Sequence, residues 1–373
     1  MSPSSKIVAP SERSLARAAS LLRQGLLIGL PTETVYGLAA DGTNVDAVGA
    51  IYRAKGRPAN NPLILHVDTP EKARRLFVER WSDQETRRWE RLSRLWPGPL
   101  TIIGRKHPGV LMEVTAGGDT VAVRIPSHPV ARRLLARVDF PVAAPSANVS
   151  NYVSPTTARH VADGLGRHVA MVLDGGACEV GLESTIVTLG REDESVKVLR
   201  SGGITREVLA DVLNESVVAA DRRIEPETDR PAEILSAPGQ LSQHYSPKTP
   251  LIMVDPERTV PVSRRSLAAS SNRSSPPARI SNAEETDTAR VLRITFFPPS
   301  QPMNGYAEVR VLSLRRNWRD VATKLYAELR RADQSDFNHI EIDRCEADGI
   351  GQAIADRLNR AVHNHLSAED VGR

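Results

Sequence analysis

The first half of the chain alternates between two hydrophobic patterns, and no other feature of the sequence constrains the fold as strongly. Residues 11–24 carry apolar side chains at helical spacing up to Gly25, and the short apolar run LLIGLP follows. Residues 44–55 repeat the helical spacing up to Gly56, and NPLILHV then has the pattern of a buried strand. This alternation predicts an α/β domain of about two hundred residues built around a sheet.

The series continues toward residue 213, where we place the end of the first domain. Further strands are predicted at TIIGR, TVAVRIP, PVAAPS, VAMVLDGG, STIVTLG and VKVLR. Helices are predicted over residues 128–137 and directly after Pro155. The first predicted domain therefore spans residues 1–213.

A second α/β pattern follows a stretch without periodicity. Residues 214–249 are rich in Pro, Ser, Glu and Gly, and a linker is predicted there. In residues 250–373, strands are predicted at PLIMVD, RVLRITFF, AEVRVLSL and HIEID, and helices over residues 318–331 and 350–363. The Ser/Arg/Pro-rich insert at residues 262–288 is interpreted as a loop. The chain is therefore expected to contain two domains, of which the second is smaller.

Composition limits the classes of function. The two cysteines, Cys178 and Cys345, supply neither a disulfide framework nor a cysteine-based zinc site, which fits a reducing compartment. The sequence shows neither a signal peptide nor a membrane span, so a cytoplasmic globular protein with no membrane partner is expected. The net charge of +4 suits an anionic substrate or a weak RNA contact and is diagnostic of neither. Aromatic residues make up 4% of the chain, too few to favour stacking surfaces for single-stranded nucleic acid.

Polar side chains gather at the ends of the elements predicted in the first domain, where α/β proteins place ligands. The segment PTETVYG follows the first strand and carries Thr34. The other segments contain cations, one histidine and several hydroxyl or amide side chains: Lys55, Arg57, Asn61, His66, Arg124, Ser146, Asn148, Ser154, Ser184 and Arg200. Together they would suit a polyanion held beside a small polar molecule. The sequence has no GxxxxGK[ST] P-loop, so a nucleotide needs a different cradle.

Each of these residues also has a purely structural explanation. Lys55 and Arg57 can complement the dipole at a helix C-terminus. Ser154 has the pattern of a helix N-cap, because a proline follows it in the first turn. His66 can be a hydrogen-bonded core residue, and Arg124 can belong to a structural ion pair. Only the combination of segments favours a ligand site.

Eight of the segments, in this order, resemble the motifs of the threonylcarbamoyl-AMP synthase family. They are PTETVYGL, AKGRPANNPLILH, LWPGPLT, TVAVRIPSHP, AAPSAN, GLESTIV, VLRSG and APGQLSQHYSPKTPL. The resemblance is to the two-domain form. It implies an N-terminal YrdC-like domain with a twisted mixed sheet and flanking helices, a linker, and a smaller C-terminal Rossmann-like α/β domain.

The resemblance implies a nucleotidyltransferase that condenses L-threonine, bicarbonate or carbon dioxide, and ATP into threonylcarbamoyl-AMP and pyrophosphate. A downstream threonylcarbamoyl-transferase machinery would then modify tRNA. The family's K-x-R and S-x-N signature is matched by residues that are candidates for catalysis: Lys55, Arg57, Ser146 and Asn148. The positions that contact threonine in the family are matched by Thr34, His66, Arg124, the backbone of Ala144, and Ser184. Those that contact ATP are matched by Arg57, Asn61, Thr120, Ser146, Ser154, Arg200 and Tyr245.

The implied reaction needs positioned charges rather than a covalent nucleophile. A carbamate formed on threonine attacks the α-phosphorus of ATP, and fixed cations with Mg²⁺ brought by ATP offset the repulsion between the two anions. No tightly bound cofactor and no metal held by the protein are expected. We expect Lys55 and Arg57 to be exposed in a cleft for this role. Residues 236–248 are predicted to form a lid, with Tyr245 against ATP, because the labile carbamate must be shielded from water.

The sequence departs from the family's motifs at one place, and two alternative functions are to be weighed against the one that the resemblance implies. The family usually carries basic residues before its HY[AS]P motif, whereas this chain has Leu241, Ser242 and Gln243. A non-catalytic RNA-binding module of the same fold is the main alternative, although such a module has no use for a threonine pocket. An enzyme that acts on carbamoyl phosphate is the other, but it depends on acylphosphatase-like and zinc-finger segments that this sequence lacks.

Overall fold

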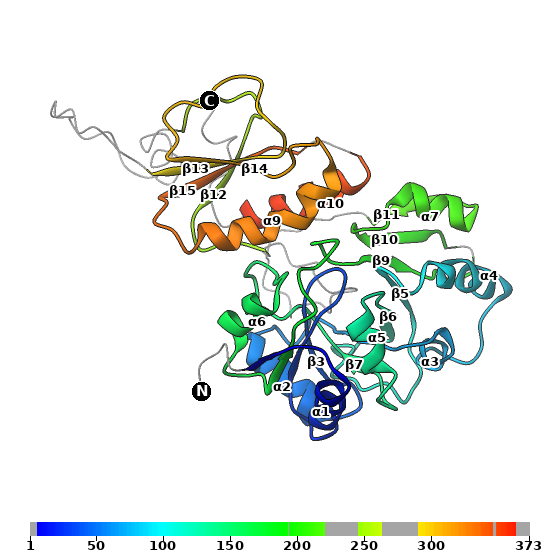
Figure 1. Cartoon of the computed structure of the whole chain (residues 1–373). Helices are drawn as coiled ribbons and strands as arrows, with labels where there is room; N and C mark the ends of the chain where they lie inside the picture. Colours follow the sequence, from blue (N-terminus) through cyan, green and yellow to red (C-terminus); the bar gives the residue numbers. More distant parts are fainter. Residues whose placement is uncertain (1–5, 193, 221–244, 263–289, 346–347, 363–373) are drawn as a thin grey trace, which may run out of the picture. The chain divides into compact units, whose positions relative to one another are not determined.

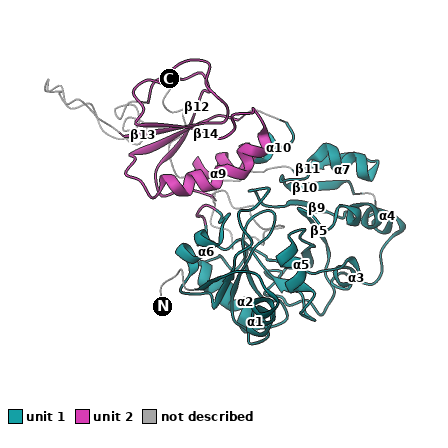
Figure 2. Ribbon diagram, in the orientation of Figure 1, with its two compact units in different colours: residues 1–150, 154–242, 348–353 teal, residues 151–153, 243–347, 354–373 magenta. Residues whose placement is uncertain are grey.

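The computed structural model describes residues 6–192, 194–220, 245–262, 290–345 and 348–362 (Figure 1). The chain forms two compact units (Figure 2). The first contains residues 1–150, 154–242 and 348–353, and the second contains residues 151–153, 243–347 and 354–373. Nearly all of the Ser/Arg/Pro-rich insert and most of the predicted lid lie outside the described residues.

The first unit is built on a mixed sheet that has eleven strands among the described residues. In spatial order they are β1 (Ile7–Val8), β8 (Met171–Leu173), β2 (Ile28–Leu30), β3 (Gly37–Asp41), β7 (Val142–Ala143), β4 (Ile64–His66), β6 (Thr120–Arg124), β5 (Leu100–Arg105), β9 (Thr185–Thr188), β10 (Val196–Arg200) and β11 (Val217–Ala219). β4 runs parallel to β6 and antiparallel to β7, so both kinds of pairing occur within the sheet. The predicted mixed α/β fold is confirmed.

Helices cover both faces of this sheet. They are α1 (Glu12–Arg23), α2 (Val45–Lys55), α3 (Pro70–Arg74), α4 (Asp83–Leu92) with the short 3₁₀ turn Ser93–Leu95, α5 (Pro129–Leu135), α6 (Ala158–Leu165) and α7 (Arg206–Leu213). Successive residues of β3 show the two faces, because side chains alternate along a strand. Ala39 packs in a core with α1 and α5, whereas Leu38 and Ala40 pack in a second core with α2 and α6.

Helix boundaries follow the local sequence signals. Ser11 caps α1 by accepting a hydrogen bond from the Ser14 backbone, and Gly25 follows the helix with a φ of 75°. Asn44 caps α2, and Gly56 closes it in the left-handed conformation, with a φ of 59°. A residue without Cβ adopts this conformation at little cost, so both helices end where the sequence predicts.

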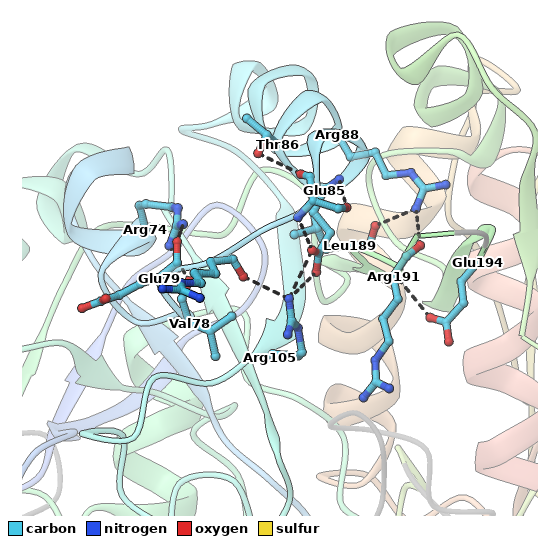
Figure 3. A network of polar contacts seen from close by, with 12 residues as sticks. Arg74, Val78, Glu79, Glu85, Thr86, Arg88, Arg105, Leu189, Arg191 and Glu194 are labelled. Atoms are coloured by element: carbon cyan, nitrogen blue, oxygen red, sulfur yellow. Dashed lines mark hydrogen bonds and ion pairs between the residues drawn. The ribbon is translucent and has the colours of Figure 1, made fainter.

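The helix α4 was not predicted from the sequence, and a polar network holds it against the sheet (Figure 3). Arg88 donates to both carboxylate oxygens of Glu215, at 2.9 and 2.8 Å, and to the carbonyl of Leu189 at 3.2 Å. Glu85 accepts from Arg105 at 3.2 Å. Glu215 lies just before β11, which pairs in parallel with β10, so the sheet of the first unit extends past residue 213.

The second unit contains a four-stranded parallel sheet with the order β12 (Leu251–Val254), β15 (His339–Asp343), β13 (Val291–Thr295) and β14 (Glu308–Val311). Two helices, α9 (Trp318–Ala332) and α10 (Ile350–Val362), lie close to the predicted ranges. The parallel sheet fits the Rossmann-like α/β domain that was predicted.

The two faces of the parallel sheet differ in polarity. Leu292, Ile294, Ile340 and Ile342 share one face by the register of β13 with β15. The residues that alternate with them on the other face include several buried polar side chains: Arg293, Thr295, His339, Glu341 and Asp343. No helix within the described part of the chain has both the length and the apolar character that a membrane span requires.

Candidate functional site

Four polar side chains lie at one end of the large sheet. His66 and Arg124 are the last residues of the parallel strands β4 and β6, and they are register partners. Thr101 of the antiparallel strand β5 pairs with Arg124. Ser184 directly precedes β9, which runs parallel to β5. Three residues predicted to contact threonine are thus brought together, and Thr101 joins them.

The loop between β2 and β3 is tied to this end of the sheet by Arg124. Its Nη1 donates to Thr34 Oγ1 at 2.9 Å, and its Nη2 donates to Glu33 Oε1 at 2.6 Å. The hydroxyls of Thr32 and Thr34 lie 2.9 Å apart, and Thr32 donates to the carbonyl of Val35 at 2.6 Å. The whole loop is buried, so its polar groups must find partners within the protein. This explains why PTET packs so many short hydrogen-bonding side chains after a strand.

The electrostatics of this cluster favour an ionised Glu33 and a neutral His66. Burial opposes ionisation of Glu33, but the charge and hydrogen bond of Arg124 outweigh it and hold the pKa of this carboxyl below its usual value. Burial, with the nearby positive charge of Arg124, lowers the pKa of His66 to about 3. The imidazole is therefore uncharged near neutral pH, and its Nδ1 lies 3.2 Å from the Ile64 carbonyl.

Two atoms of the ion pair have no hydrogen-bond partner. They are Glu33 Oε2 and Arg124 Nε, and both are buried. One is an acceptor and the other is a donor. Since buried polar groups in proteins are nearly always hydrogen-bonded, the two atoms are candidates for contact with a ligand.

Ser184 connects the predicted threonine contacts with the predicted ATP contacts. Its hydroxyl lies 2.7 Å from Thr101 Oγ1 and accepts a hydrogen bond from Arg200 Nη2 at 3.1 Å. Arg200 Nε also donates to the Ser184 carbonyl at 3.1 Å. The neighbouring Glu183 accepts from the Ser154 hydroxyl at 2.7 Å. Ser154 and Arg200, both predicted to contact ATP, thus meet at the segment Glu183–Ser184.

Lys55 is buried, and the prediction that it is exposed in a cleft was wrong. Its exposed fraction is 2%, and Nζ donates to the carbonyls of Ser146 and Asn148 at 2.5 and 2.6 Å. The Lys55 carbonyl in turn accepts from the Ser150 backbone at 2.7 Å. The lysine therefore fastens the S-x-N segment to the end of α2, because an ammonium group can satisfy two carbonyls at once.

Arg57 is also buried, with an exposed fraction of 8%, so its predicted exposure was wrong as well. Its Nε donates to the Asn61 carbonyl at 2.9 Å, and its Nη2 donates to the Asn61 side chain and to the Pro62 carbonyl. Asn61 Nδ2 is buried without a partner. The arginine shapes the loop 57–62, and Asn61 keeps one donor for a ligand.

The S-x-N segment and the PTET loop lie side by side. Ser146 forms a β-bridge with Gly37, and the Ala147 backbone donates to the Tyr36 carbonyl at 2.8 Å. The backbone N–H of Ala144 is already bonded to the Ile64 carbonyl at 3.1 Å. Only the remaining backbone group of Ala144 is thus available for the predicted contact with threonine.

Two predicted ATP contacts are not among the residues that these hydrogen bonds join. Thr120 begins β6, at the opposite end of the strand from Arg124. Tyr245 belongs to the second unit, where its ring is 2% exposed and stacks on Tyr326 with the centroids 5.7 Å apart. The roles of both residues stay predictions.

Sequence reasoning missed three residues of the cluster, although each lies inside a motif. Glu33 stands between the two threonines of PTET, Thr101 ends LWPGPLT, and Glu183 precedes Ser184 in GLESTIV. The alternative role of Ser154 as an N-cap was wrong, since Thr157 caps α6. Among the described residues, no group of three or more His, Cys, Asp or Glu side chains could hold a metal ion.

Two family models match the chain and together span most of it. One, described as "Telomere recombination", matches residues 20–202. The other, described as "Threonylcarbamoyl-AMP synthase, C-terminal domain", matches residues 204–362. The boundary between the matches lies close to the start of α7.

Curated proteins and a solved structure are similar along nearly the whole chain. The threonylcarbamoyl-AMP synthase of Bacillus subtilis is 33% identical over 94% of this chain and 93% of its own. The enzyme of the same name from Pyrococcus abyssi is 34% identical over 92% of each chain. The crystal structure of P. abyssi Sua5 complexed with L-threonine has a TM-score of 0.76 and 32% identity, and it covers 95% of this chain and 96% of its own.

Proposed function

This chain belongs to the threonylcarbamoyl-AMP synthase family, and we propose that it condenses L-threonine, bicarbonate or carbon dioxide, and ATP into threonylcarbamoyl-AMP and pyrophosphate. In chemical terms it is a nucleotidyltransferase, because the adenylyl group of ATP moves to a carbamate oxygen. The observation that carries the proposal is the buried cluster around Arg124, in which Thr34, Glu33 and Ser184 meet at one end of the sheet. The similar P. abyssi Sua5 was crystallised as a complex with L-threonine, and this supports the proposal.

The unpaired atoms of the ion pair suit an α-amino acid. A threonine carboxylate would accept from Arg124 Nε, because the guanidinium keeps donors beyond those used by Glu33 and Thr34. The substrate nitrogen would donate to Glu33 Oε2. The threonine hydroxyl would meet the hydroxyl pair of Ser184 and Thr101. His66 is neutral near pH 7, so it adds a dipole at this site without adding a charge.

Residues predicted to contact ATP lie next to this cluster. Arg200 and Ser154 reach it through Ser184 and Glu183, and Asn61 keeps an unpaired donor. Mg²⁺ would arrive with the phosphates of ATP as part of that substrate, since magnesium is usually held by one or two carboxylates and the substrate phosphates. Lys55 would act through the segment Ser146–Asn148, which it holds in place.

The reaction follows from this arrangement in two steps. The threonine nitrogen attacks carbon dioxide, a C–N bond forms, and the nitrogen releases a proton to solvent. A carbamate oxygen then attacks the α-phosphorus, and the bond from that phosphorus to the bridging oxygen of pyrophosphate breaks. The arginines neutralise the approaching anions, and burial protects the carbamate from reversal.

The product would serve a separate transferase machinery that modifies tRNA, which would act in the same compartment, expected to be the cytoplasm. The similarity of the whole chain to synthases supports this function over a non-catalytic RNA-binding module. Pyrophosphate release with ATP, threonine and bicarbonate, each omitted in turn, tests the proposal. Release that continues unchanged without threonine would contradict it.

A further inference from the structure

The second unit has a cavity of its own at the carboxyl end of its parallel sheet. Its volume is about 390 Å³. Residues at the ends of three strands line it: Asp255 follows β12, Thr295 ends β13, and Asp343 ends β15. In open α/β sheets, ligands bind outside the carboxyl ends of the strands. None of the residues predicted to contact threonine or ATP lines this cavity.

One hydroxyl at the cavity is buried without a partner. Thr295 is 2% exposed, and its Oγ1 makes no hydrogen bond. Leaving such a group unsatisfied in a folded protein is unfavourable, and few natural structures keep one without a reason. Because Thr295 lines the cavity, a polar ligand there would supply the missing partner.

Aromatic rings form one wall. Trp318 packs against Phe296 and Phe297, with ring centroids 5.4 and 4.9 Å apart and planes inclined by 62° and 72°. All three side chains line the cavity, and Trp318 and Phe297 are only partly buried. A wall of this kind stacks well with a flat heterocycle.

The remaining wall carries charges of both signs. Asp343 is already engaged, since it accepts from Arg293 Nη2 at 2.5 Å and from the Phe296 backbone at 2.6 Å. Asp255 and Glu257 are exposed and also line the cavity, and Asp255 Oδ1 accepts from the Glu257 backbone at 2.8 Å. Arg316 and Arg344 line the cavity as well, and Arg316 Nη2 donates to the Pro298 carbonyl at 3.3 Å. The cavity thus combines acceptors for hydroxyl groups with donors for an anion.

Arg316 also lies in a strained backbone conformation beside the start of a helix. Its φ is 55°, in the left-handed region that a residue with a side chain seldom adopts. The helix α9 begins two residues later, at Trp318. Asn317 caps this helix by accepting from the Arg319 backbone at 2.8 Å, so Arg316, which lines the cavity, is the group here that favours a phosphate.

We propose that this cavity binds a nucleoside monophosphate. The base would stack on Trp318 and Phe297, the ribose hydroxyls would bond to Asp255 and Thr295, and the phosphate would meet Arg316 and Arg344. A volume near the lower end of the range for ligand pockets suits a mononucleotide rather than a dinucleotide. The site is separate from the site of adenylate synthesis, so the inference goes beyond the proposed function.

Trp318 provides a reporter for the test, because the other tryptophans, Trp81, Trp89 and Trp96, belong to the first unit. AMP is titrated into the full chain while tryptophan fluorescence is recorded. We expect a saturable change that disappears in Trp318→Phe. The lack of any saturable change attributable to Trp318 up to millimolar AMP would overturn the proposal. Adenosine or inorganic phosphate binding as tightly as AMP would overturn the assignment to a nucleotide.

The substitution Thr295→Val tests the contact without removing a hydrogen bond from the free protein. We expect an unchanged or higher melting temperature and AMP binding weakened by about tenfold. Thr323→Val is the control, since Thr323 lies on α9, donates to the Arg319 carbonyl and does not line the cavity. AMP binding that is unchanged in Thr295→Val would argue against the site.

Pyrophosphate release, measured in parallel, separates this inference from the proposed function. Both Trp318→Phe and Thr295→Val should still form the adenylate, since neither residue belongs to the catalytic cluster. A wild-type protein that forms the adenylate but shows no AMP-dependent Trp318 signal would refute only the nucleotide site. A normal Trp318 signal without synthesis would refute only the proposed function.

Discussion

Arg124 and Glu33 form an ion pair 2.6 Å long in which neither side chain is more than 5% exposed. Removing either partner of such a pair is strongly destabilising, because it leaves a buried charge without compensation. Arg124 also bonds to Thr34, so the same guanidinium fixes the loop that carries the predicted threonine contacts. The conformation of this loop and the proposed binding of threonine would therefore both depend on Arg124.

The substitution Glu33→Gln should reduce both stability and activity. The amide keeps the shape of the side chain but leaves Arg124 unpaired, and we expect a loss of about 3–5 kcal/mol in the free energy of unfolding. The KM for threonine should rise. Glu12→Gln is the matched control, because Glu12 pairs with Arg133 and Arg137 at the surface and should matter little. If Glu33→Gln and Glu12→Gln lost the same free energy of unfolding, burial would not be the reason for the large effect expected of the Arg124–Glu33 pair.

The stability of the pair should also depend on pH. The pKa of Glu33 is lowered in the folded protein, so its contribution is present above the pKa of the unfolded chain and is lost as the pH falls through the folded pKa. The difference in unfolding free energy between the wild type and Glu33→Gln should therefore begin to shrink as the pH falls below about 4.3, the usual pKa of an unfolded glutamate. Denaturant titrations between pH 3 and pH 8 would measure this, and a constant difference would contradict it.

Substrate selectivity should reveal the hydroxyl pair of Thr101 and Ser184. A site that hydrogen-bonds a substrate hydroxyl rejects the isostere that lacks it, so kcat/KM for valine should be at least about a hundredfold lower than for threonine. Serine should fall between them. In Ser184→Ala, the kcat/KM values for threonine and valine should differ less than they do in the wild type. Equal turnover of the two amino acids by the wild type would remove the basis for this assignment.

The sequence predicted the order of the elements well because hydrophobic periodicity is a local signal. It predicted the burial of charged residues poorly. Lys55 and Arg57 follow the pattern of solvated helix ends, and only the folded chain brings the Ser146 and Asn148 carbonyls to the ammonium group. The helix α4 was missed because Trp89 and Leu92 are its only apolar residues, and because Glu215, the partner of its Arg88, is distant in sequence.

Alanine substitutions of Lys55 and Arg53, which lie on the same helix, can distinguish the effect of a positive charge at the helix end from the effect of the buried contacts of Lys55. Lys55 and Arg53 both lie in the last turn of α2 and both complement its dipole, but Arg53 is exposed. Lys55→Ala should lower the melting temperature and abolish most adenylate formation. Arg53→Ala should change the melting temperature little. A stable but inactive Lys55→Ala protein would show that the lysine serves chemistry alone.

The contact of Tyr245 with ATP can be tested without disturbing its packing. Tyr245→Phe keeps the ring that stacks on Tyr326 and removes only the hydroxyl. If the tyrosine of the predicted lid bonds to the nucleotide, the KM for ATP should rise severalfold while the KM for threonine stays the same. A lower melting temperature with an unchanged KM for ATP would instead assign Tyr245 to the core of the second unit.

The hydrogen bonds of Lys55 have a chemical consequence for an enzyme that handles carbon dioxide. Its Nζ donates to the carbonyls of Ser146 and Asn148 and, at 3.5 Å, to the Asn148 side-chain oxygen. As an ammonium group, Lys55 has three N–H bonds for these acceptors and no lone pair. Carbon dioxide adds only to an amine with a lone pair, so this lysine is protected from carbamylation. In the proposed reaction, the threonine nitrogen would then be the nucleophile that carbon dioxide meets.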